Sequence, residues 1–469
     1  MAGLLNALNA ARTSLEVNQK SIEVVGNNIS NVNTEGYSRQ SAELSPTPSL
    51  QFGNFFIGNG VKITTIQRDH DVFIQSQLED KYVDFGFANG QARSLGELEG
   101  VFNVSEENIS TEIDRFFDSW QQLSSNPGDP VLRDVIIHRG NLLASGFNSL
   151  ANDLNGVVHN INDAIQSKVD GLNGVIEEIA ELNDRIYNIE IQGQMANSDR
   201  DRRDLLVKDL AEKLGTTTYL DKTGMVNVQL PGGLPIVQGN MPMRLETVTN
   251  GSNVDLQLHA GGTVRNLSTH TLGGEMLGMF TMRDQFIPSI MQDVDRLAWE
   301  VGNQVNLQHT SGASLDGTAA TEFFLDTTAV SPPASSIYEN AARNMAVLID
   351  NSDHVAAGLP GAPAPGDNRN ALLMANIGEQ ISINGVDNYN SFYARITSRI
   401  GIESNQNELS LGGAEDAVNQ LENLREGVVG VSLEEEMISL IQYQRGFESS
   451  AKFLSTVDEL MDSIINMKR

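Results

Sequence analysis

Residues 4–29 read LLNALNAARTSLEVNQKSIEVVGNNI, and their spacing decides how the chain begins to fold. Apolar or small side chains recur at alternating intervals of four and three residues, with the polar Asn18 at one position of the row. This heptad period keeps an apolar stripe on the side of a helix that faces a partner helix. The predicted stripe consists of Leu4, Leu8, Ala11, Leu15, Ile22, Val25 and Ile29. We expect the helix to end near Asn27 and Asn28, because a turn signal follows at residues 33–36.

The C-terminal part of the sequence repeats this pattern. Ser432 can cap a helix while Glu435 reaches back to the N–H of the cap, and acidic residues then occupy the first turn, where the helix dipole favours them. Gln444 and Asp458 interrupt the stripe. Its apolar members are Leu433, Met437, Leu440, Phe447, Ala451, Leu454, Met461 and Ile465. A second row makes the apolar face wider than a two-stranded coiled coil needs, and consists of Phe453, Val457, Leu460, Ile464 and Met467.

Two interpretations of these paired stripes stay open. In the first, the two helices form an intramolecular coiled coil that closes an ordinary domain. In the second, they form an interface through which the chain assembles. Each buried Leu or Phe contributes about 1.5–3 kcal/mol, and large exposed apolar stripes mark partner surfaces. Both interpretations can hold together if the ends pair with each other while the second row meets a neighbour.

Composition excludes several classes of protein. The 469 residues include 61 acidic and 31 basic side chains, and a surface with a net charge of -30 repels nucleic acid. No run of about twenty apolar residues is present, so we expect no membrane span. The sequence has no cysteine, which excludes disulfides and thiolate metal sites. The first residues lack the features of a secretory signal peptide, so export would need another route.

The interior is predicted to be mainly helical, with one β-rich part. Helical patterns cover about residues 80–125, 130–190, 198–214, 276–307 and 391–425. A breaker at residues 126–130, Asn-Pro-Gly-Asp-Pro, separates the first two. Between residues 216 and 258, alternating runs separated by turn signals predict short antiparallel strands. The predicted fold class is therefore mainly α with a small antiparallel β element.

A search for catalytic chemistry finds no constellation. The seven histidines are scattered, and no phosphate-binding, dinucleotide-binding, zinc-protease or nucleophile-elbow motif is present. We interpret the cluster at residues 68–71, Arg-Asp-His-Asp, as a solvated turn. We interpret Asp201-Arg-Arg-Asp204 as ion pairing along a helix face. The pattern at Asp350 and Asp353 lacks the Gly and Glu of a calcium loop. We expect no enzyme, no cofactor and no metal site.

A resemblance to a known family rests on both ends and on the interior. The segment GNNISNVNTEGYSR, residues 26–39, resembles the signature of flagellar axial proteins, which form the rod, the hook and the hook-associated parts. Residues 432–467 are similar to the C-terminal end of the same family. Interior motifs are similar to the hook-associated members at the hook–filament junction: FFDSWQQLSSNPGDPVLR at 116–133, DRRDLL at 201–206, GGEMLG at 273–278 and LENLREGVVGVS at 421–432.

The resemblance implies three structural parts. Residues 1–50 with 430–469 would form a discontinuous terminal coiled-coil domain for polymerisation. Residues 51–215 with 270–429 would form an elongated helical-bundle domain, and residues 216–269 a β-rich element. It also implies secretion through the flagellar type III channel, a place at the hook–filament junction, and a role as a mechanical adaptor.

The implied partners are copies of the same chain in a ring, the hook protein, a second junction protein (hook-associated protein 3) and a cytosolic export chaperone on the C-terminal helix. No nucleic acid or membrane partner is expected. A soluble binding module such as an adhesin, and an enzyme on an axial scaffold, are the alternative functions. The predicted assembly residues are Leu4, Leu8, Leu15, Ile22, Val25, Ile29, Tyr37, Arg39, Met437, Leu440, Phe447, Leu454, Val457, Leu460, Met461, Ile464 and Ile465.

Overall fold

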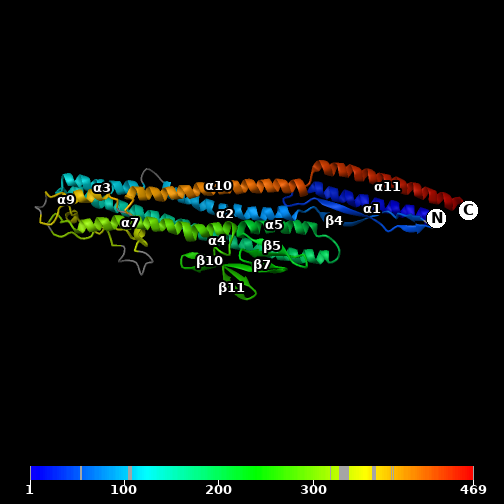
Figure 1. Ribbon diagram of the computed structural model, residues 1–469, viewed down its shortest axis with the longest axis horizontal. Helices are drawn as coiled ribbons and strands as arrows, with labels where there is room; N and C mark the ends of the chain where they lie inside the picture. Colours follow the sequence, from blue (N-terminus) through cyan, green and yellow to red (C-terminus); the bar gives the residue numbers. More distant parts are fainter. Residues whose placement is uncertain are drawn as a thin grey trace.

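The computed structural model describes residues 2–52, 55–103, 108–316, 318–326, 337–361, 366–381, 383 and 385–467. The molecule is elongated, and both ends of the chain lie at one end of its long axis (Figure 1). There α1 (Ala2–Ser30) and α11 (Leu433–Met467) run side by side. Long helices fill the rest of the axis, and small antiparallel sheets lie on one side of them. The predicted fold class, mainly α with a β-rich part, is confirmed.

We call residues 2–68 and 433–467 the terminal unit. Besides its two helices it contains β1 (Gln40–Pro46), which pairs antiparallel with β4 (Val61–Arg68) and packs with it along α1. A second hairpin joins β2 (Leu50–Phe52) to β3 (Phe55–Ile57). These strands are absent from the sequence-based prediction, and the predicted boundary between residues 50 and 51 falls inside them. Helix α1 also runs to Ser30, slightly beyond its predicted end.

We call residues 72–429 the body. Its long helices are α2 (Val72–Asn103), α3 (Ile109–Ser125), α4 (Pro130–Glu190), α5 (Asn197–Leu214), α7 (Ile287–Thr310) and α10 (Tyr389–Val429). Shorter helices are α6 (Gly274–Thr281), a π-helical turn (Met282–Phe286), α8 (Ala341–Asn344) and α9 (Arg369–Ile377). The single helix predicted for 80–125 is two helices, because Asn108 caps a new one by accepting from the Thr111 amide at 3.0 Å. The predicted break at 126–130 is confirmed, since Asp129 caps α4 and Pro130 begins it.

The body has one continuous apolar core along its helices. Its distal part is aromatic: the rings of Phe116, Trp120, Phe323 and Phe324 contact one another edge-on or tilted. The imidazole of His309 is buried among them, where Nε2 accepts from the Ala356 amide at 3.0 Å and Nδ1 lies 2.6 Å from the Thr321 carbonyl oxygen. This histidine therefore stabilises the core and faces no solvent.

Glycines bring three helices unusually close together. A Cβ placed on Gly278 of α6 would meet the backbone of α2 at Phe87 O, and would lie 3.1 Å from the Cα of Gly90. A Cβ on Gly90 or on Gly86 would likewise run into backbone atoms of Glu275 or of Glu212, at the end of α5. Small residues at these crossings allow the backbones themselves to pack, so larger side chains are excluded.

Two small sheets dock on α4 through asparagine side chains. One sheet has the order β5 (Thr217–Leu220), β6 (Val226–Leu230), β7 (Leu234–Gln238), β8 (Met241–Pro242), and the other is β11 (Thr263–Asn266), β10 (Asn253–Ala260), β9 (Arg244–Asn250). Asn173 donates to Leu245 O at 2.9 Å and accepts from Leu245 N at 2.8 Å. Asn183 does the same with Val226, at 2.7 and 3.2 Å. Asn162 bonds Ser252 O and Val254 N, both at 3.1 Å. Each asparagine side chain thus donates to one backbone carbonyl and accepts from one backbone N–H of the sheet that it holds.

Candidate assembly interface

The two terminal helices meet along a seam of small and branched side chains. Val25 of α1, seven residues after Asn18, and Val457 of α11, seven residues after Ser450, are buried in line with the residues that meet across the pair. The hydroxyls of Ser14 and Ser450 lie 2.8 Å apart across the seam. A Cβ on Gly446 would lie 2.6 Å from Oδ1 of Asn18, so the backbones approach closely at this level. The helices therefore form an intramolecular pair, as the first interpretation of the stripes predicts.

The structure divides the predicted assembly residues into three groups. Buried in the seam are Val25 and Val457. Half-buried are Leu4, Leu8, Leu15, Ile22, Ile29, Tyr37, Arg39, Leu440, Leu454 and Met461. Exposed on α11 are Met437, Phe447, Leu460, Ile464 and Ile465.

The outward face of α11 is apolar in two stretches. Ile438, two residues after the buried Glu436, is 67% exposed on the side away from α1, whereas Ile465 is 60% exposed because α11 extends past the start of α1 there. The side chains exposed between the stretches are mainly polar, with Gln442, Gln444, Arg445 and Glu448, and include Phe447 at 38% exposure. The proximal stretch contains Leu433, Met437, Ile438 and Ile441, and the distal one Phe453, Leu460, Ile464, Ile465 and Met467. Such an uncovered apolar face on a helix already paired on its other side is typical of a partner surface.

The outward face of α1 is different in character. Its exposed side chains are mainly polar: Asn9, Arg12, Glu16, Lys20, Glu23 and Asn27. Two ion pairs within the helix, Arg12 with Glu16 and Lys20 with Glu23, lie on this face. The apolar surface of the helix pair therefore belongs mainly to α11. At the same end of the molecule, Phe55 and Phe56 of β3 are also exposed, each at 74%.

The signature segment closes onto the start of α11. The buried Asn28 amide donates to Gln40 O at 2.9 Å and to Glu436 Oε2 at 3.0 Å, while its Oδ1 accepts from the Tyr37 hydroxyl at 2.9 Å. Arg39 Nε donates to Glu436 Oε1 at 2.7 Å, and this hydrogen bond raises the pKa of Arg39. Burial, with the nearby charges of Asp201 and Glu436, raises the pKa of Tyr37 to about 12, so its hydroxyl stays a donor. Tyr37 and Arg39 thus make contacts within their own chain.

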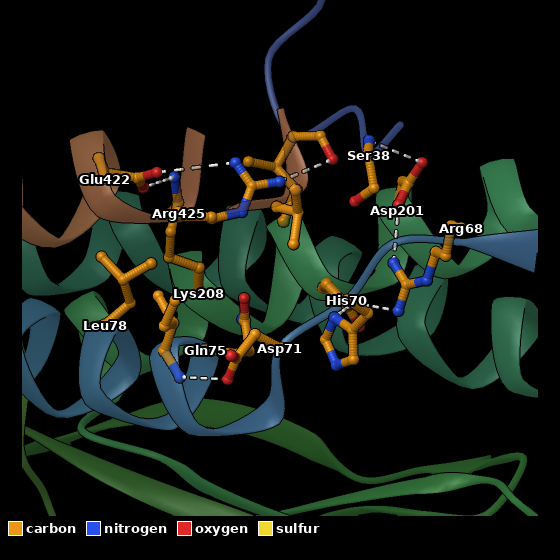
Figure 2. Close-up of a pocket in the computed structure, with 15 residues that line it drawn as sticks. Ser38, Arg68, His70, Asp71, Gln75, Leu78, Asp201, Lys208, Glu422 and Arg425 are labelled. Atoms are coloured by element: carbon orange, nitrogen blue, oxygen red, sulfur yellow. Dashed lines mark hydrogen bonds and ion pairs between the residues drawn. The ribbon is translucent and has the colours of Figure 1, made fainter. Parts of the chain in front are cut away.

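The two charged motifs of the sequence analysis bind each other. Arg68 Nη1 donates to Asp201 Oδ1 at 2.7 Å and Nη2 to Asp204 Oδ2 at 2.6 Å (Figure 2). The Arg68 side chain is only 7% exposed, so the prediction of a solvated turn is wrong for this residue. Burial lowers the pKa of Arg68, but the charges and hydrogen bonds of the two carboxylates outweigh it and the pKa is raised.

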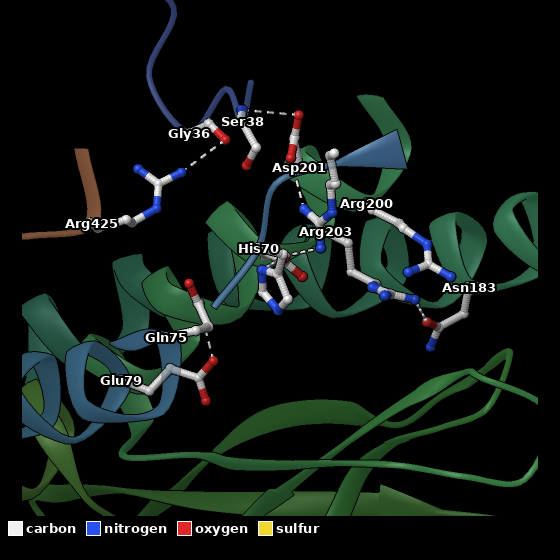
Figure 3. Close-up of polar contacts among 12 residues, drawn as sticks. Gly36, Ser38, His70, Gln75, Glu79, Asn183, Arg200, Asp201, Arg203 and Arg425 are labelled. Carbon is white, nitrogen blue, oxygen red and sulfur yellow. Dashed lines mark hydrogen bonds and ion pairs between the residues drawn. The ribbon is translucent and has the colours of Figure 1, made fainter. Parts of the chain in front are cut away.

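The prediction of ion pairing along the α5 face is also wrong, because its side chains bind other elements. Arg203 donates to Asn183 Oδ1 of α4 at 3.0 Å (Figure 3). Arg202 pairs with Glu178, also of α4, at 2.7 Å. Arg200 pairs with Glu190 at 2.6 Å from both Nε and Nη2. The local pattern suggested partners one turn away, whereas tertiary contacts supply them.

A small cavity of about 30 Å³, lined by both polar and apolar side chains, lies beside this ion-pair cluster. His70 points into it below Arg68, while Glu422 and Arg425 enter from α10 (Figure 2). Burial and then the charge of Arg68 lower the pKa of His70, so its imidazole is neutral at pH 7. No group of acidic and histidine side chains in the described parts of the chain has metal-binding geometry. Among the helices that the structure describes, none is long and apolar enough to cross a membrane.

Family comparisons match both ends and the body of the chain. The model described as "Flagellar hook-associated protein FlgK helical domain" matches residues 95–324. The "Flagella basal body rod protein" model matches residues 5–37, and the "Flagellar basal body rod FlgEFG protein C-terminal" model matches residues 428–467. The two end matches therefore cover α1 and α11.

Individual relatives match almost the whole chain. Flagellar hook-associated protein 1 of Bacillus subtilis is 25% identical over 503 residues, which covers 99% of each chain. The protein of the same name from Escherichia coli is 24% identical over 547 residues and covers 98% of this chain and 99% of its own. The solved structure of the flagellar hook junction protein FlgK from Burkholderia pseudomallei has a TM-score of 0.68 at 16% identity. It covers 76% of this chain and 100% of its own, so the folds agree.

Proposed function

The chain belongs to the flagellar hook-associated protein 1 family, and from this premise we propose that it assembles between hook and filament through α1 and α11. It is a structural component of the bacterial flagellum, at the junction of hook and filament. The observation that supports assembly through the ends is the outward apolar face of α11, which its partner α1 leaves uncovered. Burial of several such side chains in a neighbour would contribute about 1.5–3 kcal/mol each.

The seam and the outward face have separate roles in this proposal. The seam, with Leu440 and Leu454, holds α11 on α1 within one subunit. The outward face, with Ile438 and Leu460, packs against the next subunit of a ring. The body then lies outside the helix pair and contacts its neighbours laterally, so that the ring adapts one polymer to another.

The proposed partners follow from the same surface. Copies of this chain, the hook protein and hook-associated protein 3 would bury the apolar face after assembly. Before assembly, the same face needs a cover in the cytosol, and an export chaperone on α11 would supply it. The chain has no cysteine, so passage through a type III channel would break no disulfide. The high net charge of -30 would keep the unassembled subunit in solution.

The test introduces one negative charge at different positions of α11. Leu460→Asp, on the exposed face, should leave the monomer's helical circular dichroism unchanged and strongly reduce incorporation into flagella. Leu454→Asp and Leu440→Asp, in the seam, should abolish incorporation while the body remains folded. Ser455→Asp is the matched control, because Ser455 is polar and exposed beside Leu454. Wild-type incorporation of Leu460→Asp and Leu454→Asp would contradict the proposal.

A further inference from the structure

The chain passes between the terminal unit and the body twice, through short segments that lie together. One is Asp69–Asp71, between β4 and α2, and the other is residues 430–432, between α10 and α11. Arg39 lies next to both: its N–H donates to Val429 O, directly before the second segment, at 2.9 Å, and its carbonyl oxygen accepts from Asp69 N of the first segment at 2.8 Å. Two adjacent short connections between two rigid parts have the topology of a hinge.

Each segment ends where a long helix begins. Asp71 Oδ1 accepts from Phe73 N at 2.9 Å and from Ile74 N at 3.1 Å, which caps the start of α2. Ser432 O accepts from Glu436 N at 2.9 Å at the start of α11. The capped helices are stiff, so bending between the two parts would concentrate in the three residues of each segment.

The contacts across this hinge are mainly polar. Asn197 of α5 donates to Ile66 O at 2.8 Å, and Ser38 N donates to Asp201 Oδ2 at 3.3 Å. Arg425 of α10 donates to Gly36 O at 3.2 Å (Figure 3). The cavity of about 30 Å³ lies between the same elements and is large enough to hold water. An interface of this kind does not hold two parts rigidly by shape alone, because polar contacts can be exchanged for water.

Arg68 differs from these contacts because the donor and both acceptors are charged and Arg68 itself is buried. It is the last residue of β4, directly before the first hinge segment, and its two nitrogens bind two carboxylates of one helix turn on α5. Asp201 is also buried, with 8% of its side chain exposed. Movement of β4 away from α5 would break both charged hydrogen bonds of Arg68 at once, and such bonds are stronger than those between neutral groups.

We propose that residues 69–71 and 430–432 form a two-segment hinge, and that Arg68 pins it by bridging Asp201 and Asp204 in the orientation of Figure 1. The pin sets the direction of the α1–α11 pair relative to the body. Without it, the terminal unit swings as a rigid part while both parts keep their folds. The hinge is a property of the single chain and does not rest on the proposed assembly.

Paired nitroxide labels measure this orientation directly, and the chain has no native cysteine to interfere. Asp416→Cys on α10 and Gln444→Cys on α11 are exposed positions on opposite sides of the hinge. Gln19→Cys with Lys452→Cys, both within the terminal unit, forms the internal reference pair. Double electron–electron resonance should give a narrow distance distribution for both pairs in the otherwise unchanged chain.

Arg68→Gln should broaden the distribution across the hinge about twofold or more and leave the reference pair unchanged. Arg68→Lys should give an intermediate width, because one ammonium cannot bridge both carboxylates as a guanidinium does. If Arg68→Gln fails to fold, Asp204→Asn tests the same bridge more gently, and it too should broaden the distribution. Arg202→Gln is the matched control, since it breaks the pair with Glu178 that lies wholly inside the body.

Three results would overturn the pin. The first is a wild-type distance distribution in folded Arg68→Gln or Asp204→Asn. The second is equal broadening in Arg202→Gln, which would show a general effect of charge loss on α5. The third is a broad reference pair in the otherwise unchanged chain, because a terminal unit that is unfolded in solution cannot be held by Arg68.

Discussion

The Cα of Gly90 lies 3.1 Å from the position that a Cβ on Gly278 would occupy, so α2 and α6 touch backbone to backbone. We predict that Gly90→Ala destabilises the body by about 1–3 kcal/mol, because the added methyl would enter the backbone of Glu275 and force the helices apart. Chemical denaturation followed by circular dichroism measures the loss.

The same helix offers the control for this substitution. Gly96 and Gly100 of α2 have no atom within 4 Å of an added Cβ. Gly96→Ala should therefore stabilise the protein by about 0.5–1 kcal/mol, as alanine is the better helix former. Equal effects at Gly90 and Gly96 would show that the close approach does not limit residue size.

We predict that removal of one asparagine side chain of α4 destabilises only the sheet that this side chain holds. Asn173→Ala leaves the N–H and C=O of Leu245 without their partners, at a cost of about 1–3 kcal/mol. Amide exchange should accelerate in β9 and β10 before it does in β5 and β6. Asn188→Ala, at an exposed position of the same helix, should change exchange in neither sheet.

Removal of the buried carboxylate at the start of α11 should loosen both terminal helices. Glu436→Ala leaves Asn28 and Arg39 without their shared acceptor, and we expect a loss of about 1–3 kcal/mol. Limited proteolysis with mass spectrometry should show faster cleavage in α1 as well as in α11. Glu434→Ala is the control, because it removes an exposed charge two residues before Glu436. Faster cleavage of α1 in that variant would refute the specific role of Glu436.

His309 predicts a decline of stability in mild acid. Burial lowers the pKa of this histidine to about 4, whereas the unfolded chain has its ordinary value of 6.5. Between these pH values the unfolded state takes up a proton and the folded state does not. The contribution of His309 to the free energy of unfolding is therefore complete above pH 6.5 and is lost as the pH drops toward about 4. The loss is on the order of 3 kcal/mol.

His309→Gln isolates this contribution, because glutamine does not titrate. Thermal unfolding at several pH values between 4 and 7 should show a weaker pH dependence in the variant than in the parent chain. Half-buried Asp295, whose pKa is raised to about 6 mainly by partial burial, acts in the opposite direction, and its contribution cancels because both chains contain it. Identical pH profiles would mean that folding does not lower the pKa of His309.

Periodicity was sufficient to predict most of the long helices, because an apolar stripe is a local property of the sequence. The stripes of α1 and α11 and the segments of α5, α7 and α10 were predicted on this basis. The strands β1 and β4 were missed, although Val61, Ile63 and Ile66 alternate in the manner of a strand with one irregularity. A bulge shifts the register between Glu43 and Leu44, so the two sides of the hairpin lack a simple matching pattern.

The polar contacts could not be predicted in the same way. Arg68 and Asp201 are 133 positions apart, and nothing local distinguishes their pairing from pairing along one helix. The asparagines of α4 did leave a signal, since Asn162, Asn173 and Asn183 directly follow the apolar residues at positions 161, 172 and 182. A polar amide at the edge of a buried face must find a partner, but the sequence does not reveal which strand provides it.

The bond between Asn28 and Glu436 joins residues 408 positions apart, and this separation has a consequence for the timing of folding. The signature segment is among the first parts made, yet one of its acceptors is not available until almost the whole chain has been synthesised. Contacts of such long range form late, because closing the loop costs entropy that earlier contacts do not repay. A nascent chain therefore keeps its N-terminal end open, and a chain truncated before Glu436 never completes the network. This buried network therefore forms only after the chain has been synthesised at least as far as Glu436.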